Sequence, residues 1–347
     1  MKRMNVTKWS HSLILIALLI LLSAALVSCG QKEETAIINE DTSYLDVISP
    51  WIETEERVPY YSTLYFTDGQ GYEFKNAFSN KLIIFLTGYS WFHDIISEIG
   101  GKLDWSHIVD WLLPLYSEYN FFQPEKFDWG RGRNYFWNIE NRERYTFDNL
   151  IANYASVIRE YLSQNDYETI IIFGHSEGGI IAPELYFWLN DFNISAIISS
   201  GAGGLTFPID IAAARRGIPL EEETVKQYQD AYDQYLATYS GERYAQAPDE
   251  IHFRQTREGF IPLIYSYTQQ ARRPFEFYKN IDIPVLFIHS LLDVYVSPIS
   301  TRYIEQNLPD KPFDYIYYKD SQHYPTTVRE LERLRVDIAE WLREKGL

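Results

Sequence analysis

Residues 170–179 read Ile-Ile-Ile-Phe-Gly-His-Ser-Glu-Gly-Gly, an apolar run that ends at a serine set between glycines. Such a run is typical of a strand that is buried on both faces. Apolar residues at helical spacing follow in Gly179–Leu189, so we expect a strand, a tight turn and a helix around Ser176. The turn fits the pattern G-x-S-x-G in the context that a nucleophile elbow requires. The alternative is a tight turn that contains a serine without catalytic use.

Outward from this turn, strand-like and helix-like segments alternate along the chain. The expected strands are Ser62–Phe66, Lys81–Thr87, Thr169–Phe173, Ile194–Ser199, Ile283–His289 and Phe313–Tyr318. The expected helices are Trp105–Tyr116, Phe147–Leu162, Gly179–Leu189 and Thr327–Arg343. This alternation predicts an α/β fold with a mostly parallel, doubly wound sheet that helices flank on both sides.

One long interval, from about Leu205 to Phe275, interrupts the alternation. It is charged and helix-prone, as in Glu221–Tyr239, and shows no buried-strand run. We interpret it as a helical cap insertion over the sheet. The predicted organisation is a lipoprotein signal peptide (1–28), a tether (29–56), the first part of the core (57–204), the cap (205–275) and the second part of the core (276–347).

The N-terminal segment has the features of a secretory signal. Lys2, Arg3 and Lys8 precede the apolar stretch Leu13–Leu22, and small residues lead to Cys29. Leu26-Val27-Ser28-Cys29 resembles the bacterial lipobox, which implies lipidation of the Cys29 thiol and an exported, membrane-attached lipoprotein of the bacterial cell envelope. The alternative is an uncleaved signal anchor, because the apolar stretch approaches the length of a short membrane span.

Composition excludes several function classes. The 347 residues carry a net charge of −17, which argues against a nucleic-acid partner. A single Cys forbids an internal disulfide. The sequence contains no HExxH, no Cys pair and no dinucleotide or phosphate loop, so we expect neither a metal nor a cofactor. Aromatic residues reach 16%, enough to line a lipid or carbohydrate cleft, although rings are equally common as packing material.

A catalytic serine needs a base, and three histidines lie downstream of Ser176. His252 falls in the expected cap, and His289 lies at the end of an expected strand, where packing or local hydrogen bonding is the favoured role. His323 lies in a loop directly after the last strand, at the sheet edge where ligands bind. The spacing therefore favours His323 as the base.

The chain resembles the α/β-hydrolase family over about Lys81–Gly204 and Pro274–Arg343. The resemblance rests on GHSEGG at 174–179, IPVLFIHSLLDVYVSP at 283–298 and KDSQHYP at 319–325. Position by position, it implies Ser176 as nucleophile, Asp293 as acid and His323 as base. Asp320, three residues before His323, is the competing acid, although a loop aspartate so close more often caps a turn.

The resemblance also implies an oxyanion hole after the strand at 81–87. The family often has His-Gly there, whereas this chain has Thr87-Gly88-Tyr89. Backbone N–H groups of Tyr89 and Glu177 can still form the hole, because such donors do not depend on side-chain identity.

These features predict a serine hydrolase that acts on a small-molecule acyl substrate, with carboxylic esters favoured. A serine peptidase or amidase of the same fold is the first alternative, and acidic Glu221–Glu223 in the cap would suit a free amino terminus. The second alternative is a non-catalytic binding lipoprotein that keeps the fold.

Overall fold

The computed structural model describes residues 61–76, 78–86, 88, 96–99, 102–105, 112, 115, 117–125, 146–246, 253–256, 259–262, 269–323, 325 and 328–347. The predicted signal peptide, the tether, Cys29, Tyr89 and His252 lie outside these residues.

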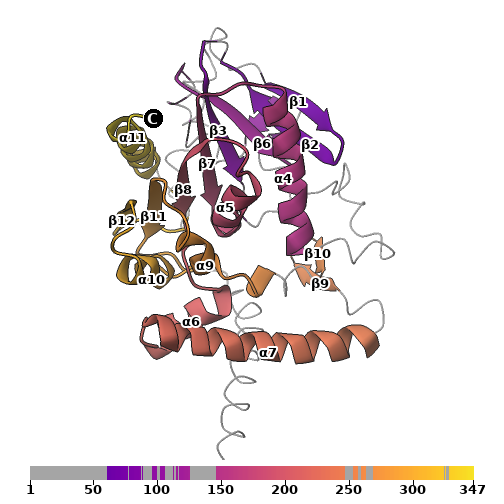
Figure 1. The fold of residues 1–347 in the computed structure, drawn as a ribbon, viewed down its shortest axis with the longest axis vertical. Helices are drawn as coiled ribbons and strands as arrows, with labels where there is room; N and C mark the ends of the chain where they lie inside the picture. Colours follow the sequence, from indigo (N-terminus) through magenta and orange to yellow (C-terminus); the bar gives the residue numbers. More distant parts are fainter. Residues whose placement is uncertain are drawn as a thin grey trace, which may run out of the picture.

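An eight-stranded sheet forms the centre of the molecule, in the order β1-β2-β6-β3-β7-β8-β11-β12 (Figure 1). Its strands are β1 (Tyr61–Phe66), β2 (Gly69–Phe74), β3 (Lys81–Leu86), β6 (Asn120–Pro124), β7 (Thr169–His175), β8 (Ile194–Ser200), β11 (Val285–Ser290) and β12 (Phe313–Tyr318). The six strands from β6 to β12 run parallel, and β1 and β2 add an antiparallel edge. The mostly parallel sheet predicted from the sequence is therefore present.

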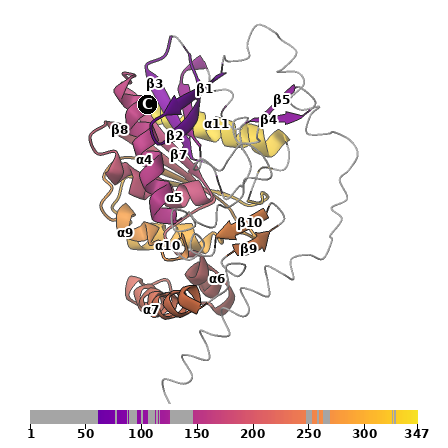
Figure 2. The same cartoon turned by 90° about the vertical axis from the view of Figure 1, so that its right-hand side faces the viewer.

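Apolar side chains cover both faces of the sheet because neighbouring residues of a strand point to opposite sides. In β7, Ile170 and Ile172 pack with helices α4 (Phe147–Ser163) and α5 (Glu177–Trp188). Ile171 and Phe173 pack on the other face, with helix α11 (Val328–Glu344). Figure 2 shows α4 and α5 on one side of the strands and α11 on the other.

The interval between β8 and β11 extends beyond the carboxyl ends of the strands (Figure 1). Its described elements are α6 (Phe207–Arg216), α7 (Glu222–Gln246), β9 (Phe253–Thr256), β10 (Gly259–Pro262) and α9 (Pro274–Tyr278). The insertion is mostly helical, as expected, and it also contains a short antiparallel hairpin, because β9 and β10 pair. Strands of four residues are too short to leave a clear two-residue periodicity in the sequence.

The insertion is packed onto the core rather than loosely attached. Ile209, Ala212 and Ala213 of α6 are buried within the same apolar cluster as α4 and α5. At the start of α6, the hydroxyl of Thr206 donates to Gln229 of α7 at 2.6 Å. Helix α10 (Ile299–Asn307) also contacts α6. The insertion therefore has a defined position above this end of the sheet.

No helix within the described part of the chain has the length and apolar character needed to cross a bilayer.

Candidate active site

Ser176 occupies the turn between β7 and α5 with a strained backbone. Its φ of 54° and ψ of −115° make it the one non-glycine residue with positive φ among the described residues. This region is unfavourable for a residue with a side chain and persists only when the surroundings impose it. The N–H of Ser176 donates to the carbonyl of Ser200 at 2.7 Å, which ties the turn to the end of β8. The strand, turn and helix predicted around Ser176 are present.

The flanking glycines permit the close approach of strand and helix that this turn needs. A Cβ on Gly174 would lie 2.2 Å from the carbonyl oxygen of Gly178. A Cβ on Gly178 would lie 2.1 Å from the carbonyl oxygen of Leu86 at the end of β3. Real Cβ atoms do not approach backbone oxygens so closely, so both positions require glycine.

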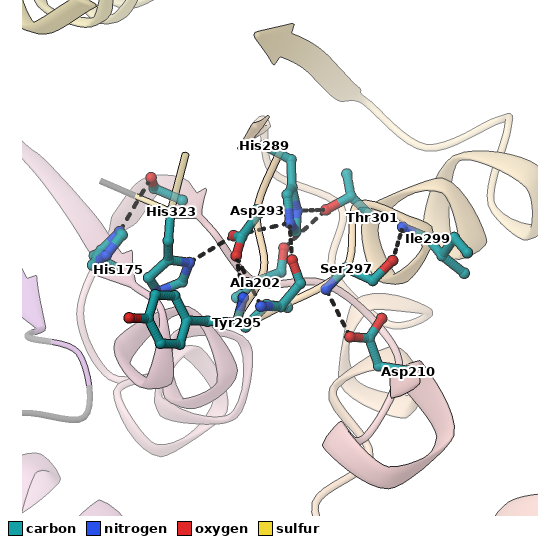
Figure 3. A network of polar contacts seen from close by, with 12 residues as sticks. His175, Ala202, Asp210, His289, Asp293, Tyr295, Ser297, Ile299, Thr301 and His323 are labelled. Carbon is teal, nitrogen blue, oxygen red and sulfur yellow. Dashed lines mark hydrogen bonds and ion pairs between the residues drawn. The ribbon is translucent and has the colours of Figure 1, made fainter. Parts of the chain in front are cut away.

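Asp293 and His323 come together although thirty residues separate them. Asp293 follows β11, His323 follows β12, and Nδ1 of His323 lies 2.6 Å from Oδ2 of Asp293 (Figure 3). The other carboxylate oxygen accepts the backbone N–H groups of Tyr295 at 2.8 Å and Val296 at 2.9 Å. A carboxylate against Nδ1 places the proton there, which leaves Nε2 of His323 as the basic nitrogen.

The pKa of Asp293 reflects two opposing influences. Burial of the carboxyl raises its pKa, but hydrogen bonds from His289 and His323 outweigh burial and hold the pKa below its ordinary value. Asp293 is therefore ionised at neutral pH, as a partner that orients an imidazole must be.

The ring of His323 lies against the turn that follows β8. A Cβ on Gly201 would lie 3.0 Å from Cε1 of His323, and the φ of Gly201 is +59°. The ring of His175, directly before Ser176, lies 4.9 Å from the ring of His323. Burial, and then the neighbouring His323, hold the pKa of His175 well below its ordinary value, so His175 is a neutral packing partner.

Two residues were predicted to supply the oxyanion hole. Glu177 is the first residue of α5, where the positive end of the helix dipole lies, and its side chain accepts a hydrogen bond from Gln269 of the insertion. Gly88 lies beside Ser176, since a Cβ on Gly88 would be 3.1 Å from Cβ of Ser176. Tyr89 is outside the described residues, so its role stays a prediction.

Other candidates named from the sequence lie in different surroundings. Asp320 is paired with Arg333, with nitrogen–oxygen distances of 2.7 and 3.2 Å, rather than with His323. In the insertion, Glu222 accepts from Lys279 and Glu223 accepts from Gln227.

Two further buried polar residues lie near the site: His289, which its place at a strand end predicted to be packed or hydrogen-bonded locally, and Asp210, which was not predicted. His289 lies 3.5 Å from Asp293, and Asp210 of α6 accepts the N–H of Ser297 at 2.7 Å (Figure 3). His289 precedes Asp293 by four residues, which was the available signal. Asp210 gave none, because nothing in the sequence indicates which face of α6 is buried. Among the described residues, no group of three or more His, Cys, Asp or Glu side chains is placed to hold a metal ion.

No protein-family model matches this sequence, and no curated protein matches it either. Solved structures do match. Est1E from Butyrivibrio proteoclasticus has a TM-score of 0.53 at 15% identity, over 82% of this chain and 98% of that chain. The uncomplexed acylaminoacyl peptidase of Pyrococcus horikoshii has a TM-score of 0.52 at 16% identity, over 88% of this chain and 44% of that chain. The Pyrococcus furiosus esterase Pf2001 has a TM-score of 0.50 at 16% identity, over 82% and 91%.

Proposed function

From the α/β-hydrolase fold that the sequence predicted and these similarities show, we propose that the chain is a serine hydrolase with Ser176, His323 and Asp293 as its catalytic triad. One observation carries the proposal. A serine with strained positive φ lies at the carboxyl edge of the sheet that also holds a buried Asp–His pair. Ser176 directly follows β7 and lies near Gly88, which comes after β3. The strand order reverses between β3 and β7, and ligands of open α/β sheets bind at such a point.

The proposed reaction is acyl transfer to water. Nε2 of His323 removes the proton from Oγ of Ser176 as Oγ attacks the substrate carbonyl. Asp293 stabilises the resulting imidazolium, and the N–H groups of Glu177 and Tyr89 bind the oxyanion. The tetrahedral intermediate expels the alcohol, which takes the proton from His323. Water, deprotonated by His323, then attacks the acyl-enzyme, releases the acid and restores Ser176.

We favour carboxylic esters as substrates over peptides. A peptidase would be supported by acidic side chains that have no other partner and can bind the free amino terminus of a peptide substrate. In the cluster Glu221–Glu223, Glu222 instead accepts a hydrogen bond from Lys279, and Glu223 accepts one from Gln227. The similar structures include both an esterase and an acylaminoacyl peptidase, so fold alone does not separate the two activities.

We further propose that the chain acts at the bacterial cell envelope, anchored by a lipid on Cys29. The support is the signal-like segment that ends in Leu26-Val27-Ser28-Cys29.

A fluorophosphonate probe tests the proposal directly. The wild-type protein should be labelled at Ser176, and Ser176→Ala should lose both labelling and ester hydrolysis. Ser163→Ala, at an exposed serine near the end of α4, is the matched control and should keep both. A panel of chromogenic esters and aminoacyl anilides then ranks esterase against amidase activity. A wild-type protein that the probe does not label would leave the binding lipoprotein as the better account.

A further inference from the structure

A second buried histidine lies behind the Asp293–His323 pair. His289, on β11, is 1% exposed. Its Nε2 lies 3.0 Å from the carbonyl oxygen of Val296 and 3.5 Å from Oδ2 of Asp293. Both neighbours are acceptors, so Nε2 carries a proton and donates it toward them.

The opposite side of the ring is held as well. Nδ1 of His289 lies 2.7 Å from the hydroxyl of Thr301 on α10, and that hydroxyl lies 2.9 Å from the carbonyl oxygen of Ala202 (Figure 3). The imidazole therefore has partners on both nitrogens, which fix its orientation inside the core.

His289 and Asp293 hold the same residue, Val296, from two sides. The N–H of Val296 donates to Oδ1 of Asp293 at 2.9 Å, and its carbonyl accepts from His289. The loop 290–296 is thus closed around the carboxylate. Oδ2 of Asp293 is shared between His289 and His323, at 3.5 and 2.6 Å.

We propose that His289 is a positioning residue for the catalytic base: its Nε2–H fixes the Asp293 loop and draws negative charge away from the oxygen that faces His323. This inference rests on the proposed role of His323 as the base. A carboxylate that accepts a second hydrogen bond stabilises a protonated imidazole less. With His289 in place, Asp293 therefore stabilises the imidazolium form of His323 less than it would alone.

Other titratable groups face the same cluster from neighbouring elements. His175 lies at the end of β7, Asp210 lies on α6, and Glu330 of α11 lines a small cavity together with His323. All three remain in the variants compared below, so their influence is common to every member of the set.

The test is the pH dependence of kcat/KM for ester hydrolysis in His289→Leu and His289→Gln. His289→Leu removes the donor, and the acid limb of the profile should move upward by about half a pH unit or more. His289→Gln keeps a side-chain N–H near the position of Nε2, and its limb should stay near that of the wild type. A purely structural role would lower the rate without moving the limb, and an unmoved limb in His289→Leu would overturn the proposal.

A second measurement needs neither turnover nor a variant. Nitrogen-15 NMR of histidine-labelled wild-type protein should show a protonated Nε2 on His289 throughout the pH range of activity, and an unprotonated Nε2 would overturn the proposal even if His289→Leu does not fold. The same spectra report the titration of His323. If fluorophosphonate fails to label Ser176, the proposed function is wrong. The protonation of Nε2 on His289 can still be read from the spectra, so the two failures are distinguishable.

Discussion

Asp210→Asn should alter how the free energy of unfolding depends on pH. Asp210 is 2% exposed and bridges α6 to the loop after Asp293 by accepting the N–H of Ser297. Its second carboxylate oxygen receives no hydrogen bond from any residue that the structure describes. Burial, only partly offset by the N–H of Ser297, raises the pKa of Asp210 from 3.8 to about 8.

The sign follows from the proton count. Between the ordinary pKa of 3.8 and about 8, the folded protein keeps a proton on Asp210 that the unfolded chain has lost. Stability therefore falls as pH rises through this window, by about 1.4 kcal/mol per pH unit from this group. From pH 4 to pH 7 the loss is on the order of 4 kcal/mol. Asn cannot ionise, so the variant lacks this loss.

Urea unfolding at four or five pH values between 4 and 8 measures the effect. The free energy of unfolding of the wild type should fall relative to that of Asp210→Asn as pH rises, whatever the offset between them at pH 4. Asp282→Asn, at an exposed carboxyl paired with Lys311, is the matched control for the same chemical change. Wild-type and Asp210→Asn curves that run parallel across this range would refute the reasoning.

Four further outcomes are expected. Asp293→Asn should reduce turnover on the order of 10⁴-fold, because the amide cannot enforce the His323 tautomer. Asp320→Asn loses only a surface ion pair with Arg333 and should reduce turnover less than about tenfold. The reverse order in ester-hydrolysis assays would show that Asp293 is not the acid of the triad. Gly178→Ala should lower the free energy of unfolding by about 3 kcal/mol, because the new Cβ clashes with the carbonyl of Leu86. Gly217→Ala should lower it by only about 1 kcal/mol, because Gly217 has a φ of +63° but open space around it. Equal losses in urea unfolding would contradict the argument that Gly178 is required by close packing. Replacement of α7 by a short linker, which keeps the packed α6, should change the relative rates on short and long esters while Ser176 still reacts with a small phosphonate; unchanged selectivity in a folded variant would count against a cap. Mass spectrometry of the exported protein should find a diacylglyceryl group on Cys29 at the new N-terminus, and an intact Met1 or unmodified Cys29 would disprove lipidation.

The central fold was predictable because its signals are local and strong. The run at 170–173 marks a strand buried on both faces. Gly174 and Gly178 after it are required because a Cβ on either would approach a backbone oxygen to less than 2.5 Å. Other strands left weaker marks. β6 has only five residues and ends in Pro124, and β9 and β10 have four each, so none gives a clear period.

The site was predictable only in part, for a related reason. Asp293 and His323 each follow a strand, and the ends of parallel strands meet at one edge, so their proximity could be inferred. The surroundings of the pair depend on packing between distant segments. His289 contacts Thr301 on α10, and Asp210 reaches a loop 87 residues away, which no spacing rule anticipates.

The order of the site residues along the chain bears on how the protein is made. Ser176 precedes the insertion, whereas Asp293 and His323 follow it. A nascent chain that has emerged only as far as α7 contains Ser176 but neither Asp293 nor His323. Under the proposed mechanism such a chain has no hydrolytic activity. Hydrolysis can begin only after β11 and β12 have been synthesised and have joined the sheet.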